Sequence, residues 1–292
     1  MRAFFFPGQG SQFEGMGLDL YESNPKAKEI FERADEILGY SLSETMFRGT
    51  EAELKATKVT QPAVFLHSMV KFQCAENLGK PDAVAGHSLG EFSALVAAGV
   101  LRFEDALRLV AKRALEMEKA CRLTDSTMAA IVGMDDESVE KVCAGIEDTI
   151  VAANYNCPGQ LVISGTKPAV SKAVEQLKSD GARMAVELQV GGAFHSPLME
   201  PAREGLQTAI EQTTFHTPIC PIYQNVDGIA ESDPKRMKDK LIQQLTAPVQ
   251  WTATLQNMLK DGYNHFLEIG GKGNVLRGML KRIDRKVPSE AV

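Results

Sequence analysis

The chain has 292 residues, of which 44% are hydrophobic and 24% are charged, and these ordinary globular values leave ample sequence for a well-buried core. The formal net charge of −6 argues against a protein whose main task is to neutralise nucleic-acid phosphates. The five cysteines are scattered, without a CxxC pair or a zinc-like cluster, and so indicate reduced thiols in a cytoplasmic protein with no metal site. No segment approaches the length of a transmembrane helix, so we expect no membrane-spanning segment.

The N-terminal part of the chain shows alternating strand and helix signals. We expect a buried strand over 3–6, closed by a Pro-Gly turn, and a second strand over 83–86. This second strand runs into a helix over 91–98, with Gly99 as its expected end. Such alternation favours an α/β domain with a parallel sheet.

The second strand meets its helix at the sequence GHSLG, which matches the G-x-S-x-G pattern of a nucleophile elbow. The flanking glycines remove side chains that would collide at a sharp turn, so Ser88 is expected to expose its hydroxyl. The backbone amide of Leu89 would then point from the helix N-terminus toward an acyl oxygen on that serine. A purely structural, glycine-flanked turn is the alternative.

A predicted helix over 103–120 carries Arg113 as the only charge on its apolar stripe, which consists of Phe103, Ala106, Val110 and Met117. Burying a guanidinium is costly unless it meets an anion, so Arg113 is a candidate anion-binding residue. Two alternatives stay open at this point: an arginine that extends its charge to solvent, or one that pairs with an internal acid.

From residue 128 to residue 188 the order of elements changes. We expect strands over 128–134, 149–156, 161–164 and 182–188, with helices over 135–146 and 168–178. The order β-α-β-β-α-β is the split motif of ferredoxin-like domains. The sequence therefore predicts a small domain at 127–189, inserted into a large domain formed by 1–126 and 190–292.

A serine nucleophile needs a base, and His195 is the candidate among the five histidines. It lies on a predicted loop, where catalytic groups tend to gather, although its spacing alone leaves the assignment open. His67 lies in an apolar run and is expected to be packed, whereas His87 should point away from the serine hydroxyl. Further along, we expect a helix over 251–259, a strand over 266–269 and a frayed tail from 287.

Six separate blocks in the same order resemble the malonyl-CoA:acyl-carrier-protein transacylase family, the acyltransferases of fatty-acid and polyketide synthesis. They are FPGQGSQ (6–12), the block 86–99, NYNCPGQ (154–160), GAFHSPLM (192–199), NVDG (225–228) and PVQW (248–251). The resemblance spans nearly the whole chain. It departs from the family pattern at Gly191 and in the glycine-rich turn at 270–274.

The resemblance implies a role for each candidate site residue. Ser88 would carry the acyl group, His195 would be its base, and Arg113 would bind the free carboxylate of the malonyl group. The backbone amides of Gln9 and Leu89 would form the oxyanion hole.

The resemblance also implies that the main-chain carbonyl of Gln250 orients the catalytic histidine. The expected fold is a hydrolase-like α/β domain with a ferredoxin-like insert. Phe194 resembles the version of the histidine motif found in enzymes that use malonyl rather than branched substrates.

Malonyl-CoA and acyl carrier protein are the expected partners, with the CoA thioester as substrate and no further cofactor, nucleic acid or membrane. We take a monomer as the working expectation. An acidic carrier protein needs a basic docking surface, and two groups qualify: Lys272, Arg277, Lys281, Arg282, Arg285 and Lys286, or Lys167, Lys172, Lys178 and Arg183. The rival hypotheses are a serine esterase with the same elbow and an inactive scaffold that only docks carrier protein.

Overall fold

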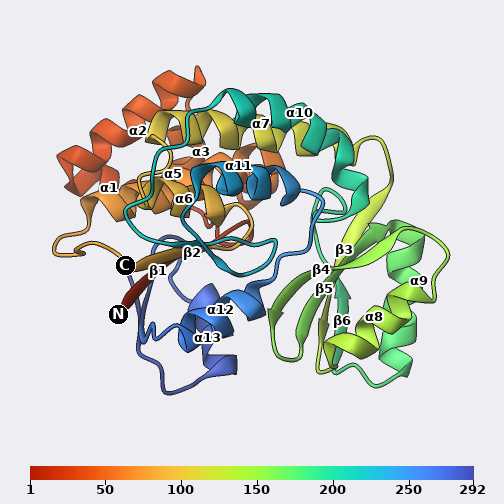
Figure 1. Ribbon diagram of the computed structural model, residues 1–292. Helices are drawn as coiled ribbons and strands as arrows, with labels where there is room; N and C mark the ends of the chain where they lie inside the picture. The colour runs from red at the N-terminus through yellow and green to blue at the C-terminus, as the bar shows by residue number, and fades with distance from the viewer.

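Two β-sheets organise the chain in the computed structural model, which describes residues 1–292 (Figure 1). The large sheet has six strands, in the spatial order β10 (Ser289–Ala291), β9 (His265–Glu268), β1 (Arg2–Phe6), β2 (Ala83–Gly86), β7 (Ile222–Tyr223) and β8 (Ala230–Glu231). All neighbours are parallel except β7 and β8. Phe6 lies opposite Gly86, so β1 and β2 end at the same edge of the sheet and bring the segments that follow them together.

Helices cover both faces of this sheet. One face carries α1 (Leu18–Ser23), α2 (Pro25–Leu38), α3 (Leu42–Arg48), α4 (Glu51–Lys55), α5 (Thr57–Cys74), α6 (Gly90–Ala97), α7 (Phe103–Cys121), the short 3-10 turn Pro197–Met199, α10 (Glu200–Gln212) and α11 (Pro234–Gln243). The opposite face carries α12 (Trp251–Lys260) and α13 (Val275–Ile283) (Figure 1). Phe4 and Phe6 belong to the first core and Phe5 to the second, as the alternation of side chains along a strand requires.

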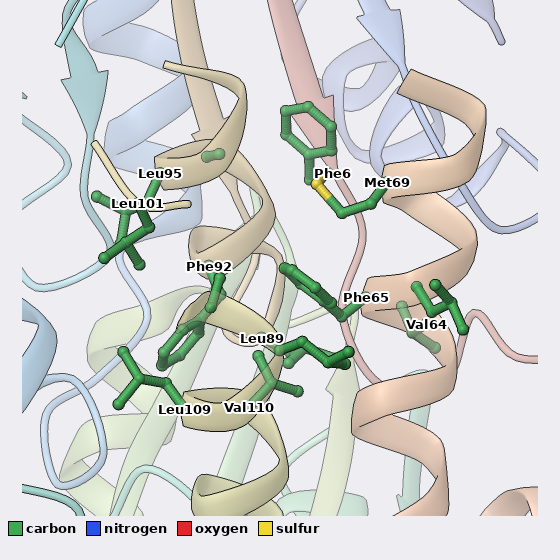
Figure 2. Packing of buried hydrophobic residues seen from close by; sticks show 14 of the residues in the cluster. Phe6, Val64, Phe65, Met69, Leu89, Phe92, Leu95, Leu101, Leu109 and Val110 are labelled. Carbon is green, nitrogen blue, oxygen red and sulfur yellow. The ribbon is translucent and has the colours of Figure 1, made fainter. Parts of the chain in front are cut away.

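The packing beneath the elbow joins α5, α6 and α7. Figure 2 shows Phe65, Phe92, Leu109 and Val110 gathered around Leu89. These side chains are almost completely shielded from solvent. Close packing of this kind holds the start of α6 and the middle of α7 in fixed relation to each other.

The small sheet is antiparallel, in the order β4 (Ile150–Cys157), β5 (Gln160–Thr166), β3 (Ser126–Val132) and β6 (Met184–Glu187). Its own core is formed with α8 (Asp136–Ala144) and α9 (Lys167–Ser179), which cover one face (Figure 1). The predicted fold class, an α/β domain with parallel strands plus a β-α-β-β-α-β insert, is confirmed. The exact division at 127–189 stays a prediction.

Two expectations about the C-terminal half were wrong or incomplete. The tail is not frayed, because residues 289–291 form β10 alongside β9 and the N–H of Val292 donates to the carbonyl of Glu268. No element was predicted between residues 199 and 251, yet this part of the chain contains α11, whose buried side chains Met237 and Leu241 recur at helical spacing. No helix in the structure has the combination of length and hydrophobicity that crossing a bilayer requires.

Candidate active site

Ser88 stands at the turn between β2 and α6, with a backbone φ of 51°, in the left-handed region that non-glycine residues rarely adopt. The flanking glycines make the turn possible. A Cβ added to Gly86 would lie 1.9 Å from the carbonyl oxygen of Gly90, and one added to Gly90 would lie 2.0 Å from that of Phe6. The predicted elbow geometry is therefore present, and the serine is left partly exposed.

His195 lies beside the serine, with Nε2 2.7 Å from the Oγ of Ser88. The Nδ1 atom of the imidazole is 2.9 Å from the main-chain oxygen of Gln244. A carbonyl oxygen can only accept, so Nδ1 carries the proton and Nε2 is free to accept the serine hydroxyl proton. The histidine also adopts a left-handed conformation, with φ 56°.

The prediction that Gln250 orients His195 was wrong. Gln250 caps the N-terminus of α12, and its carbonyl oxygen accepts from the backbone N–H and the Oγ1 of Thr254, each at 2.9 Å. That carbonyl points along the helix and is fully used there. The carbonyl of Gln244, six residues earlier at the end of α11, fills the orienting position instead.

The imidazole of His195 is held neutral by its surroundings. Only 3% of the residue is exposed, and burial disfavours the charged form. Burial first, and the nearby charge of Arg113 second, lower the pKa of His195 to about 3. The histidine is therefore in its proton-accepting form at neutral pH.

Arg113 extends from α7 to the same point and is 1% exposed. Its Nη2 lies 3.3 Å from the Oγ of Ser88 and 3.2 Å from Oε1 of Gln244, and its Nη1 donates to Oε1 of Gln61 at 2.6 Å. The guanidinium also lies 5.9 Å from the ring centre of Phe92. Burial lowers the pKa of Arg113 to about 10, which still leaves it charged at neutral pH.

Neither alternative interpretation of Arg113 fits this geometry. The side chain does not reach solvent, and it makes no ion pair with any carboxylate. Glu91 is the acid whose charge acts on it, but the oxygens of Glu91 accept from Nε2 of Gln224 and the N–H of Asn225 instead. The Nε of Arg113 has no partner at all, so a buried cation with spare donors faces the serine.

Two backbone N–H groups beside Ser88 lack an acceptor within the protein, those of Gln9 and Leu89. Their proximity follows from Gly8, where an added Cβ would lie 2.5 Å from the carbonyl oxygen of His87 and 3.7 Å from the N of Leu89. The loop after β1 can therefore press against the elbow only with glycine at this position. Paired unsatisfied N–H groups of this kind are the donors that an oxyanion needs.

A cavity of about 190 Å³ lies at this point, and apolar residues such as Met117 and Phe194 belong to its lining. Of the predicted site residues, Gln9, Ser88, Arg113 and His195 line it, whereas Leu89 and Gln250 do not. A volume of this size suits a small acyl group. No set of three or more His, Cys, Asp or Glu side chains is arranged to hold a metal ion.

Sequence reasoning missed several buried polar residues that hold the site. Asn225 accepts from the N–H of Ser88 through Oδ1 and donates through Nδ2 to the carbonyl of Gly86, both at 2.6 Å. Gln61 and Gln244 hold Arg113. Glu91, the only charged residue of the largely apolar α6, was the available signal, because a buried carboxylate requires polar partners.

His87 and His67 behave as expected. Nε2 of His87 lies 2.8 Å from Oδ1 of Asn156 and so turns away from the serine hydroxyl. His67 is 1% exposed, and its Nδ1 accepts from the N–H of Gly271.

Comparison with known proteins gives consistent similarities. A family model described as acyl transferase domain matches residues 3–291. The malonyl CoA-acyl carrier protein transacylase of Bacillus subtilis (strain 168) is 42% identical, over 99% of this chain and 92% of that protein. The crystal structure of an acyl carrier protein S-malonyltransferase from Vibrio cholerae is 40% identical with a TM-score of 0.94, covering 100% of this chain and 96% of that one. A structure described as a type II PKS acyl-carrier protein in complex with its malonyl-transacylase matches at 39% identity with a TM-score of 0.94, covering 100% of this chain and 95% of that one.

Proposed function

Because the chain belongs to the acyl transferase domain family and, within it, to the malonyl-CoA:acyl-carrier-protein transacylases, we propose that it moves a malonyl group from malonyl-CoA to the phosphopantetheine thiol of acyl carrier protein. One observation carries the proposal: the Oγ of Ser88 lies within hydrogen-bond distance of both Nε2 of His195 and Nη2 of Arg113. A nucleophile, its base and a carboxylate-binding cation thus meet at one atom.

In the first half-reaction the Oγ of Ser88 attacks the thioester carbonyl of malonyl-CoA while its proton passes to Nε2 of His195. The tetrahedral intermediate collapses by breaking the C–S bond, and the histidine returns the proton to the CoA sulfur. The product is a malonyl ester on Ser88. In the second half-reaction the phosphopantetheine thiol gives its proton to His195 and attacks this ester. The tetrahedral intermediate then breaks its C–O bond, the histidine returns the proton to the Oγ of Ser88, and malonyl leaves as the thioester of the carrier protein.

The N–H groups of Gln9 and Leu89 are proposed to stabilise the oxyanion of both tetrahedral intermediates. They are already unpaired, so no protein hydrogen bond has to break when the negative charge develops. One such donor lowers the barrier by about 3–4 kcal/mol. This stabilisation offsets the weak basicity of a buried, neutral His195.

The orientation of His195 bears on the esterase alternative. An esterase of this type is expected to place a carboxylate behind the histidine, whereas here the partner is the neutral carbonyl of Gln244. The buried charge of Arg113 beside the nucleophile likewise argues against an inactive scaffold, because a docking protein has no use for it. A covalent intermediate that waits for a thiol acceptor is the hypothesis that both observations favour.

Mass spectrometry of the intact protein tests this function. After incubation with malonyl-CoA we expect a single malonyl adduct on Ser88 that is stable in buffer and disappears when carrier protein is added. The Ser88→Ala variant should form no adduct. Rapid loss of the adduct to water without carrier protein would favour the esterase, and no adduct on the unaltered chain would contradict the proposed function.

The docking surface stays a prediction. Of the C-terminal basic group, Arg282 donates to the carbonyl of Pro158 and Arg277 to that of Gly273, and Lys281, Arg282 and Lys286 are exposed. A cytoplasmic location, a monomeric state and independence of cofactors also remain predictions. The chemistry itself asks for no cofactor, since one reactant is an activated thioester and the other a thiol.

A further inference from the structure

The hydrogen-bond partners of Arg113 are all uncharged. Its Nη1 donates to the amide oxygen of Gln61 at 2.6 Å, and its Nη2 donates to the amide oxygen of Gln244 at 3.2 Å and to the hydroxyl of Ser88 at 3.3 Å. Both glutamines are completely buried. No carboxylate lies within ion-pair distance of the guanidinium.

A neutral acceptor and a carboxylate orient a guanidinium in similar ways, but they differ in what remains for a ligand. An amide oxygen fixes the direction of the N–H groups and leaves the positive charge uncompensated. A carboxylate at the same place would form a buried ion pair and remove the attraction for a second anion. Glutamine and glutamate have almost the same shape, so the choice between them at these two positions is a choice of charge.

The buried acid that acts on Arg113 is kept at a distance. The carboxylate of Glu91 is engaged by Nε2 of Gln224 and the N–H of Asn225 at 2.9 and 2.8 Å. Its charge therefore eases the burial of Arg113 without occupying the donors of the guanidinium. The Nε–H of Arg113 has no partner, and one Nη1–H is not used by the protein.

Gln244 also connects Arg113 to Ser88 and His195. Its Nε2 donates to the carbonyl of Ser88 at 3.0 Å, and its own main-chain carbonyl accepts from Nδ1 of His195 at 2.9 Å. One residue thus contacts the cation, the nucleophile and the base, which come from three distant segments. Gln61 contacts the cation but neither the nucleophile nor the base, because its Nε2 meets only the Sδ of Met117 at 3.3 Å.

We propose that Gln61 and Gln244 are specificity-determining positioning residues: two neutral amides that aim Arg113 while leaving its charge unpaired for the carboxylate of the acyl group. The inference rests on the proposed function, since it concerns how that site selects a dicarboxylic acyl thioester over an uncharged one. Gln244 has the additional task of fixing the carbonyl of Ser88.

The test compares malonyl-CoA and acetyl-CoA as donors for the full chain, with kcat and KM measured separately. Gln61→Glu should lower kcat/KM for malonyl-CoA by about 100-fold or more, mainly through KM, and leave acetyl transfer unchanged or raised. Gln61→Met removes the acceptor without adding charge, so it should cost malonyl transfer about tenfold at most. Gln244→Glu should lower kcat for both donors, because it also removes the amide donor to the carbonyl of Ser88.

The same glutamine-to-glutamate change at the exposed Gln256 of α12 is the matched control and should alter neither donor. Equal losses with malonyl and acetyl in Gln61→Glu, or identical effects of Gln61→Glu and Gln61→Met, would overturn the proposal. Adduct formation by the unaltered chain separates the proposed function from the specificity role of the glutamines. If the unaltered chain forms a malonyl adduct and the Gln61→Glu variant has the same kcat/KM as the unaltered chain, the specificity role fails while the function stands.

Discussion

Arg113 acts on two neighbours at once. Its positive charge is proposed to attract the substrate carboxylate, and the same charge helps to keep His195 unprotonated, after the larger effect of burial. The Nη2 of Arg113 lies 3.3 Å from the hydroxyl of Ser88, so the positive charge favours an anion at this site. Selectivity and base strength are therefore coupled through one side chain.

Replacing Arg113 by alanine should separate malonyl from acetyl transfer. The substrate carboxylate would be buried without a partner, which costs about 3–5 kcal/mol, or a hundredfold or more in kcat/KM for malonyl-CoA. Acetyl-CoA carries no such charge and should lose little. Steady-state kinetics with both donors measures the ratio. Arg108→Ala, which removes an exposed arginine of the same helix, is the control, and a loss of equal size with both donors would refute the role of Arg113.

At the level of elements, the small domain helps to place His195, the proposed base. The loop that carries His195 is tied to two strands of the small sheet. Oγ of Ser164 in β5 donates to the carbonyl of Phe194 at 2.7 Å, and the N–H of Ala193 donates to Oγ of Ser126 in β3 at 3.2 Å. These bonds hold the two residues that precede His195, whose strained left-handed conformation persists only when its surroundings are held.

The Ser164→Ala variant should therefore slow the reaction without weakening substrate binding. It leaves the buried carbonyl of Phe194 unsatisfied, at a cost of about 1–3 kcal/mol in the free energy of unfolding. Relaxation of the loop should lower kcat by about tenfold while KM for malonyl-CoA changes little. Ser171→Ala, at a serine of α9 that bonds Glu187, is the matched control. A change in KM alone would indicate that Ser164 shapes the acyl pocket rather than the position of the base.

How much of this site the sequence could predict depends on the range of the interactions. The elbow at Ser88 and the apolar stripe around Arg113 are local patterns, so they were predictable, and β1, β2 and α7 appeared close to their observed bounds. The partners Gln61, Gln244 and Asn225 lie 52, 131 and 137 residues from the groups they hold. No periodicity in the sequence indicates such contacts. The assignment of Gln250 came from the family resemblance, and no local pattern pointed to Gln244 instead.

The strand β10 illustrates the same limit at the end of the chain. The strand has only three residues, Ser-Glu-Ala, and nothing in their own sequence favours an ordered strand. They are ordered because β9 offers a free edge whose hydrogen-bonding groups they satisfy. The neighbouring strand supplies the stabilisation that the local sequence lacks.

For the molecule as a whole, folding buries histidines that must stay neutral. His67 and His195 are 1% and 3% exposed, and burial lowers the pKa of His67 to about 4 and of His195 to about 3, against an ordinary value of 6.5. The unfolded chain takes up protons at these sites below pH 6.5, whereas the folded chain does not. The stability that these groups contribute is therefore present above pH 6.5 and is lost as the pH falls toward their folded-state pKa values.

His67 allows this effect to be measured away from the active site. Between pH 7 and pH 5 its shift should lower the free energy of unfolding by about 2 kcal/mol. His67→Asn keeps an acceptor for the N–H of Gly271 but cannot be protonated, so this variant should lose about 2 kcal/mol less over the same interval, whatever its stability at pH 7. Urea unfolding at the two pH values gives both differences. His216→Asn, at an exposed position, should behave like the unaltered chain, and an unchanged pH dependence in His67→Asn would show that His67 is not the group that titrates.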